Sequence, residues 1–239
     1  MSVGARVLKY QVLRAYAQPA EPWQLLLLEP WTAPTLWTFI GSYWPDYNYI
    51  DFISSPRSLC GRMGTGFPIG TFYFGDAMLT GYPCIPEIRI VNNVKWKYSA
   101  SENHYNWFRA QAMPPWPQIY PMNCYFLRFY NAMVVFGYYV AGGGNTIAYH
   151  NFSPALSLDT WYKYRFTMWD YPSHAVPTSL KYQFDLWETD HWTTYLSGIT
   201  NAQLWSGSAV NYYGNFVHHS GYYNQVGNFQ DDVEIWVPT

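Results

Sequence analysis

The sequence carries little charge. Asp, Glu, Lys and Arg together make up 12% of its 239 residues, about half the ~25% usual in soluble domains. The formal net charge is −2, and Lys and Arg form no block, so the electrostatic footprint of a duplex-binding protein is missing. Aromatic residues reach 21%, but the basic groove that must accompany them in single-strand binding is missing as well. We therefore expect no nucleic-acid partner.

Cysteine is also scarce. The three cysteines are Cys60, Cys84 and Cys124, an odd number that excludes a fully paired framework. Two arrangements stay open, namely one disulfide with one thiol, or three buried thiols. No His stands at ligand spacing from any of the three, so a zinc site is not expected.

Long apolar runs are absent. The longest, Leu25 to Leu28, is far too short to span a bilayer. Met1 to Arg6 shows no charged segment followed by an apolar one, so no signal peptide is visible. A composition rich in Tyr, Trp, Asn and Thr is common on extracellular and virion surfaces. A virion component assembled inside a host would reconcile the two observations, and we favour a virion or extracellular surface. An ordinary intracellular protein, or one trimmed of its leader, is the alternative.

The sequence does show alternation of apolar and polar residues with a period of two, and this pattern is clearest between Asp159 and Glu188. Each arm of this stretch puts apolar side chains on one face and polar ones on the other, as a half-buried strand does. The apolar positions are Tyr162, Tyr164, Phe166 and Met168 in the first arm, and Leu180, Tyr182, Phe184 and Leu186 in the second. Pro172 and Pro177 exclude a continuous helix. The pattern predicts an antiparallel pair whose apolar face is covered by a second sheet.

The sequence of the whole chain predicts some 12 to 15 short strands, separated by Gly/Pro turns. The expected fold class is all-β, a two-sheet antiparallel β-sandwich forming a single domain over residues 1–239. Strands occupy residues 1–112, the Pro-rich segment 113–117 is a connection, and residues 118–239 form a jelly-roll half.

Three local features are predicted as well. Residues 57–70 hold four glycines and favour a loop. The Gly-, Ser-, Asn- and Tyr-rich stretch 206–228 also favours a loop around its two adjacent histidines. Asn92 interrupts a run of apolar positions of the same parity, which indicates a β-bulge there.

Four segments, in this order, resemble the concanavalin A-like lectin/glucanase (laminin-G-like) jelly-roll superfamily. They are YFLRFYNAMVVFGYYV, NFSPALSLDTWYKYRFTMW, LKYQFDLWE and GYYNQVGNFQDDVEIW, mainly within residues 124–237. Trp161 stands at the family's Trp position, and Asp231-Asp232-Val233 at its closing motif. The usual Asp-Gly turn is replaced here by residues 188–191. The resemblance implies a jelly roll with a concave sheet, often used for glycans, but a fold does not assign a function.

The same resemblance directs attention to acidic residues. Glucanase members carry Glu-x-Asp-x-x-Glu on one strand, and retaining enzymes need the paired carboxyls ~5–5.5 Å apart. The nearest candidates are Glu188 and Asp190, which share a strand face, whereas Asp185 has the opposite parity. The motif is not matched, and solvated carboxylates near a turn are the simpler interpretation. Lyase members use a Tyr/His pair with Arg and Gln, and the six histidines show no such constellation.

Asp231 and Asp232 stand where many laminin-G-like sandwiches hold a structural calcium. Calcium takes six to eight oxygens, so backbone carbonyls would have to complete the site. Asp231 shares parity with Phe229, Val233 and Ile235, which predicts that it points inward and needs a partner. A calcium ion could be the partner of the Asp231 carboxylate, and backbone amides could equally be its hydrogen-bond donors. No other cofactor is expected.

Two aromatic clusters are candidates for a binding surface. The first is Trp44, Tyr47 and Tyr49, beside Asp46 and Asn48. The second is Tyr212, Tyr213, Tyr222 and Tyr223, with nearby Asn residues. Exposed rings of this kind bind sugars, but subunit interfaces are also enriched in Tyr and Trp, and packing inside the sandwich is the third interpretation.

These observations favour a non-catalytic structural or adhesion β-sandwich protein, an outward-facing component of a virion or a cell-surface assembly. Its partners would be protein subunits, copies of itself included, or glycans. A carbohydrate-binding lectin-like module is the first alternative. A glycoside hydrolase or polysaccharide lyase is the second, and it is disfavoured because no catalytic set of residues is assembled in the sequence.

Overall fold

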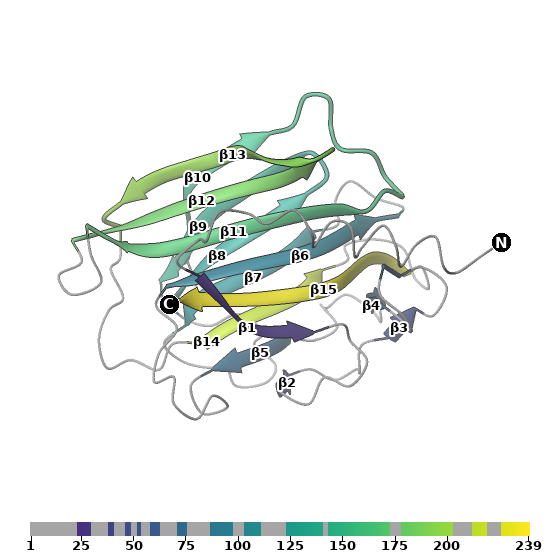
Figure 1. The fold of residues 1–239 in the computed structure, drawn as a ribbon, viewed down its shortest axis with the longest axis horizontal. Helices are drawn as coiled ribbons and strands as arrows, with labels where there is room; N and C mark the ends of the chain where they lie inside the picture. Colours follow the sequence, from purple (N-terminus) through teal and green to yellow (C-terminus); the bar gives the residue numbers. More distant parts are fainter. Residues whose placement is uncertain are drawn as a thin grey trace.

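The computed structural model of the chain describes residues 23–29, 38–40, 46–48, 52–53, 58–62, 71–75, 87–97, 103–110, 123–140, 143–172, 178–202, 212–218 and 226–239. The regular structure in these ranges is all strand and forms two antiparallel sheets, as the sequence predicts (Figure 1). Within the same ranges no helix is long and apolar enough to cross a bilayer.

The two sheets contain eight and seven of the described strands. Sheet A has the order β13-β12-β11-β6-β15-β4-β3, and β1 also pairs with β15. Its strands are β1 (Trp23–Glu29), β3 (Asp46–Asn48), β4 (Ser58–Arg62), β6 (Ile88–Trp96), β11 (Tyr162–Tyr171), β12 (Ser179–Glu188), β13 (His191–Thr200) and β15 (Val226–Pro238). Sheet B has the order β10-β9-β8-β7-β14-β5-β2. Its strands are β2 (Thr38–Ile40), β5 (Thr71–Gly75), β7 (Asn103–Ala110), β8 (Cys124–Tyr130), β9 (Met133–Val140), β10 (Gly143–Asn151) and β14 (Tyr212–His218).

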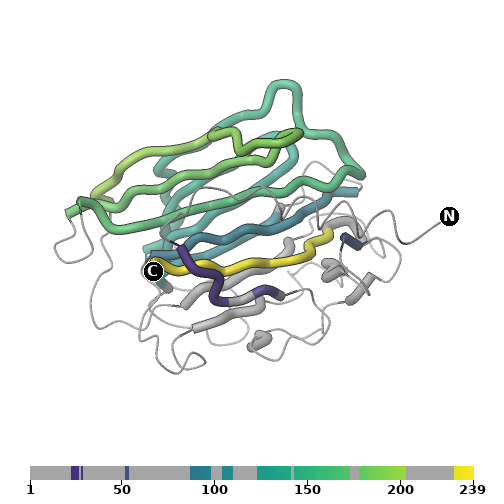
Figure 2. Tube along the Cα trace, viewed as in Figure 1, coloured from purple at the N-terminus to yellow at the C-terminus, as the bar shows by residue number. Residues whose placement is uncertain are grey.

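Each sheet combines strands from both halves of the chain. In sheet A, β6 lies between β11 and β15, and in sheet B, β7 lies between β8 and β14. Figure 2 shows the same interleaving along the trace, with β15 in yellow beside β6 in blue. Each sheet therefore takes strands from both sides of the Pro-rich segment 113–117.

The pair predicted between Asp159 and Glu188 is confirmed. β11 and β12 are antiparallel, with Phe166 opposite Phe184, and both rings are completely buried. Their apolar faces meet sheet B in a core rich in aromatic rings. Phe129 of sheet B, for example, makes an edge contact with Phe184 at 5.0 Å between ring centroids. Such pairs add about 0.5–1.5 kcal/mol each beyond the burial of their area.

An ion pair crosses this core. Arg109 on β7 has φ 49°, and the pairing register between β7 and β14 shifts in the same region. Its guanidinium reaches across to sheet A, where Nη2 donates to Asp170 Oδ1 at 2.5 Å. The two side chains are 0% and 2% exposed, so the pair is a dry link between the sheets.

Two predicted loops contain strands. β4 occupies Ser58–Arg62 within the glycine-rich segment 57–70 and pairs with β15 and β3. β14 occupies Tyr212–His218 within 206–228 and pairs with β5 and β7. Glycine and asparagine disfavour strands locally, but hydrogen bonding to neighbours on both sides outweighs that preference here.

The bulge predicted at Asn92 lies in the neighbouring strand instead. β6 keeps an unbroken register with β11 past Asn92, whereas β15 shifts between Asp231 and Glu234, where Asp232 has φ 50°. The extra residue reverses the parity of β15. Asp231 therefore lies on the face opposite Val233, not on the same face as the sequence predicted, because a bulge cancels the period-two rule.

Candidate functional site

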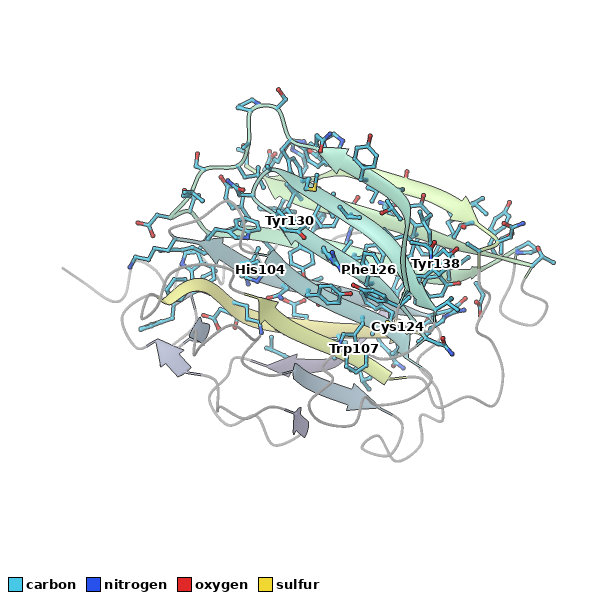
Figure 3. The ribbon with its side chains drawn as sticks, turned by 180° about the vertical axis from the view of Figure 1, so that it is seen from behind. His104, Trp107, Cys124, Phe126, Tyr130 and Tyr138 are labelled. Carbon is cyan, nitrogen blue, oxygen red and sulfur yellow. The ribbon has the colours of Figure 1, made fainter. Side chains whose placement is uncertain are left out.

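The face of sheet B turned away from sheet A carries a second cluster of side chains. Along β7, Phe108 belongs to the core between the sheets, whereas Tyr105 and Trp107 belong to a separate cluster with Cys124 and Phe126 of β8. Strand alternation explains the division, since neighbouring side chains point to opposite faces. Figure 3 shows Trp107, Cys124 and Phe126 close together over β7 and β8.

Strand register brings an arginine into this cluster. Arg128 on β8 lies opposite Tyr105 on β7 and opposite Val135 on β9. The next row along the strands places Phe126 opposite Trp107 on one side and Gly137 on the other. Three adjacent strands thus supply the site, which we call the Arg128 cluster: Tyr105, Trp107, Phe126, Arg128 and Tyr139.

The guanidinium of Arg128 lies among three aromatic rings. Its central carbon is 5.1 Å from the ring centroid of Tyr105, 4.9 Å from that of Phe126 and 5.8 Å from that of Tyr139. These are cation–π distances. Arg128 Nη2 also donates a hydrogen bond to the Tyr139 hydroxyl. The rings hold the guanidinium in one orientation on the sheet face.

Gly137 makes room for the ring of Phe126. A Cβ atom at position 137 would lie 2.5 Å from Phe126 Cζ and 2.2 Å from the carbonyl oxygen of Asn145. The ring of Phe126 therefore leans over β9, where it contacts Tyr139 at 4.9 Å between centroids. On the other side it stacks on Tyr105 at 5.8 Å.

Burial and neighbouring groups fix the charge states in the cluster. Burial acts to lower the pKa of Arg128, but the hydroxyls of Tyr105 and Tyr139 outweigh it and raise that pKa, so the guanidinium stays charged. Burial raises the pKa of Tyr105 well above its ordinary value, and burial also raises the pKa of the Cys124 thiol. Both groups are neutral at physiological pH, which makes the phenol a poor base and the thiol a poor nucleophile.

Two donors in the cluster have no acceptor within the part of the chain that the structure describes. They are the indole N–H of Trp107, whose side chain is 0% exposed, and the Nε–H of Arg128. A buried donor left without a partner costs roughly 1–3 kcal/mol. Such a cost is expected to persist where a ligand supplies the acceptor. The cluster is therefore suited to an oxygen-rich ligand with apolar faces.

The predicted carboxylates lie elsewhere, at the turn between β12 and β13. Glu188 accepts hydrogen bonds from the hydroxyls of Tyr195 and, at 2.8 Å, Thr193. These two bonds, that of Tyr195 first, lower the pKa of Glu188, so the carboxylate is ionised and unsuited to donate a proton. Asp190 is exposed and pairs with His191 at 2.8 Å. Neither residue belongs to the Arg128 cluster.

Asp231 and Asp232 lie side by side at the bulge in β15. Asp231 Oδ2 accepts the backbone N–H of Ile53 at 2.7 Å, and Oδ1 accepts that of Asp232 at 2.9 Å. The buried carboxylate of Asp231 is therefore hydrogen-bonded by backbone amides. Among the described residues no three His, Cys, Asp or Glu side chains converge as a metal site. Calcium at this position stays a prediction.

The two predicted aromatic clusters fall on different sheets. Tyr47 lies on β3 at one edge of sheet A, whereas Tyr212 and Tyr213 lie on β14 of sheet B. The other members, Trp44, Tyr49, Tyr222 and Tyr223, lie outside the described residues, as do the side chains of Cys60 and Cys84. β14 is the neighbour of β7, and Gly214 lies opposite Trp107. The second predicted cluster therefore begins beside the Arg128 cluster.

Comparison with known proteins identifies the fold. No family model and no curated protein matches the sequence, but solved structures do. The carbohydrate recognition domain of Emp47p matches with a TM-score of 0.59 and 12% identity over 93% of this chain and 100% of that one. Alginate lyase vAL-1 from Chlorella virus gives 0.57 and 10%, over 90% and 100%. The CBM2 module of the evolved Dit of Lactobacillus casei BL23 phage J-1 gives 0.52 and 11%, over 90% and 96%. The chain shares with these proteins the two-sheet jelly-roll β-sandwich fold that its sequence predicted.

Proposed function

We propose that the protein is a non-catalytic carbohydrate-binding β-sandwich whose glycan contacts the Arg128 cluster. The observation that carries this proposal is the pair of donors at Trp107 and Arg128, which have no acceptor within the described residues. Sugar hydroxyl and ring oxygens are acceptors, and the partly buried ring of Tyr139 beside the guanidinium offers an apolar face. A few polar groups set among aromatic side chains are the usual make-up of a small-molecule site.

The solved structures support this proposal by analogy of fold. One is named as a carbohydrate recognition domain, one as an alginate lyase and one as the CBM2 module of a phage Dit protein. A shared fold alone assigns no function, so the proposal depends on the side chains of the Arg128 cluster. The virion or cell-surface role predicted from composition is the setting in which such binding would act as adhesion, and it stays a prediction.

Binding without catalysis is favoured by the charge states of the described groups. Glycoside hydrolysis needs two carboxyl groups flanking the bond, one of them protonated. Glu188 has a lowered pKa. Lyase chemistry needs a base, and burial raises the pKa of Tyr105 well above its ordinary range. Glu188 therefore lacks the proton that the catalytic acid must donate, and Tyr105 is not the ionised base that a lyase would need.

A glycan array followed by calorimetry tests the proposal. The unmodified protein should bind at least one class of glycan, and Trp107→Phe and Arg128→Met should each weaken binding to that glycan about tenfold or more. Such a loss corresponds to about 1.4 kcal/mol, the size of one good hydrogen bond in a dry site. Leu158→Ala is the matched control, because Leu158 is 39% exposed and lies outside the cluster. An array without any ligand, or variants that bind as well as the original, would reject the proposal.

A further inference from the structure

The outer face of sheet A carries a second arrangement of rings and cations. Because Phe166 and Phe184 face the core, their strand neighbours Arg165, Thr167 and Asp185 face outward. The register aligns Arg165 with Asp185, and Thr167 with Arg89 of β6. This face is independent of the Arg128 cluster, which lies on the other sheet.

Two arginines on this face each lie against a tryptophan. The guanidinium carbon of Arg165 is 4.6 Å from the ring centroid of Trp192 on β13. That of Arg89 is 4.7 Å from the ring of Trp23 on β1. Between these outer rings stand β12, β11, β6 and β15. Six neighbouring strands at a spacing of about 4.8 Å give a track roughly 24 Å long, perpendicular to the strands.

Asp185 holds the side chain of Arg165 in place on this track. Its carboxylate accepts Arg165 Nε at 2.8 Å, Gln183 Nε2 at 2.8 Å and Thr194 Oγ1 at 2.6 Å. The side chain of Asp185 is only 1% exposed, and that of Arg165 is 11% exposed. Since buried, hydrogen-bonded charges are held rigidly, the guanidinium of Arg165 is presented in a fixed orientation.

Positive charge is in excess on this face. Among the described residues of β6, β11, β12 and β15, its cations outnumber its carboxylates, five to three, in a chain whose formal net charge is −2. The cations are Arg89, Lys95, Lys163, Arg165 and Lys181, and the carboxylates are Asp185, Asp231 and Glu234. Burial first, and then the nearby charge of Arg165, lower the pKa of Arg89 to about 10. Two cations held together in this way gain from a bound anion.

We infer that the outer face of sheet A is a second binding surface, and that its ligand is an extended acidic polysaccharide. Arg89, Arg165 and Lys181 would contact the anionic groups, and the rings of Trp23 and Trp192 would pack on the sugar faces. Lys181 itself lies 5.2 Å from the ring of Trp169, so the same combination of ring and cation occurs a third time. Carboxylate and sulfate groups share the chemistry that this surface recognises.

The test uses the full chain with three immobilised polymers: polygalacturonate, dextran sulfate and uncharged dextran. We expect binding to one or both polyanions, a loss of binding as salt rises, and none to dextran. Which polyanion binds identifies the group as carboxylate or sulfate. Arg89→Gln and Lys181→Gln should each weaken binding at least fivefold, while Arg89→Lys and Lys181→Arg keep most of it.

Two further variants separate this surface from the Arg128 cluster. Trp107→Phe should leave polyanion binding unchanged, so failure of one proposal does not decide the other. Lys181→Gln is the safer variant if Arg89→Gln lowers the melting temperature, because Lys181 is only half-buried. The inference is wrong if neither polyanion binds, or if both Gln variants bind as well as the original. It is also wrong if the protein dimerises through this face and the Gln variants break the dimer.

Discussion

Arg109 and Asp170 join the two sheets through an ion pair of 2.5 Å in which both side chains are almost fully buried. The Asp170 backbone N–H is held in turn by Glu87 Oε1 at 3.0 Å. The positive φ of Arg109 coincides with the position at which β7 sends this side chain toward sheet A. Removal of one partner would take this ion pair away from a buried site.

We predict that Arg109→Met lowers the free energy of unfolding by about 3–5 kcal/mol, because the buried carboxylate of Asp170 loses the guanidinium that faces it. The double variant Arg109→Met/Asp170→Leu should recover most of that loss, since it buries no charge. Denaturant unfolding of the three proteins measures both effects. A single variant within about 0.5 kcal/mol of the original would show that the pair contributes nothing.

His104 should make the protein sensitive to acid. Burial lowers the pKa of His104 to about 3, whereas in the unfolded chain it is about 6.5. The unfolded state therefore binds a proton first, and stability should fall by roughly 1.4 kcal/mol per unit as pH drops from about 6.5 toward 3. Urea unfolding between pH 7 and pH 4 tests this slope.

The matched variant for that experiment is His104→Leu, which removes the titrating ring from a fully buried site. Its stability should depend less steeply on pH than that of the original, because only the carboxylates still titrate. If the two proteins lose stability in parallel between pH 6.5 and pH 4, His104 is not the source of the acid sensitivity.

Gly137→Ala should disturb the Arg128 cluster, because the new methyl group would displace the ring of Phe126. The added methyl group would lie 2.5 Å from Phe126 Cζ and 2.2 Å from a backbone oxygen, so the ring and the strand must both shift. We expect a loss of about 1–3 kcal/mol in stability, the usual cost of overpacking, together with weaker glycan binding. Gly143→Ala is the control, since its nearest neighbour would be 3.4 Å away. Equal effects of the two substitutions would contradict this explanation.

Glu188→Gln should change a tyrosine titration and leave glycan binding as it was. The hydrogen bond to Glu188 is the first cause that raises the pKa of Tyr195 to about 12. With a neutral partner that pKa should fall toward its ordinary value of about 10, which NMR of ring-labelled tyrosine can follow. A pKa that stays at about 12 would show that Glu188 does not control it. Lost glycan binding would place Glu188 in the site.

The sheets could be predicted where one face is apolar and the other polar. β11 and β12 follow that rule, so both the pair and its buried face were predicted from the sequence. The side-chain parity of β15 could not be predicted from the sequence. The bulge at Asp232 requires a positive φ, and no glycine in the sequence marks that position.

The Arg128 cluster was missed for a related reason. β8 reads CYFLRFY, with aromatic residues at both parities, so alternation cannot tell which face meets the core. Tyr105 and Tyr139 lie on other strands, and only the register of β7 and β9 with β8 brings them to Arg128. The nearest available signal was an arginine inside an otherwise apolar strand, which must find a partner if it is buried.

The indole N–H resonance of Trp107, followed in ¹⁵N-labelled protein during titration with a glycan that the protein binds, tests the central proposal most directly. We expect this resonance to shift as the glycan accepts the hydrogen bond of the Trp107 indole. The indole N–H of Trp96, which also has no acceptor among the described residues but faces the core between the sheets, should stay in place. A glycan that binds without moving the Trp107 resonance would place the site elsewhere and contradict the account.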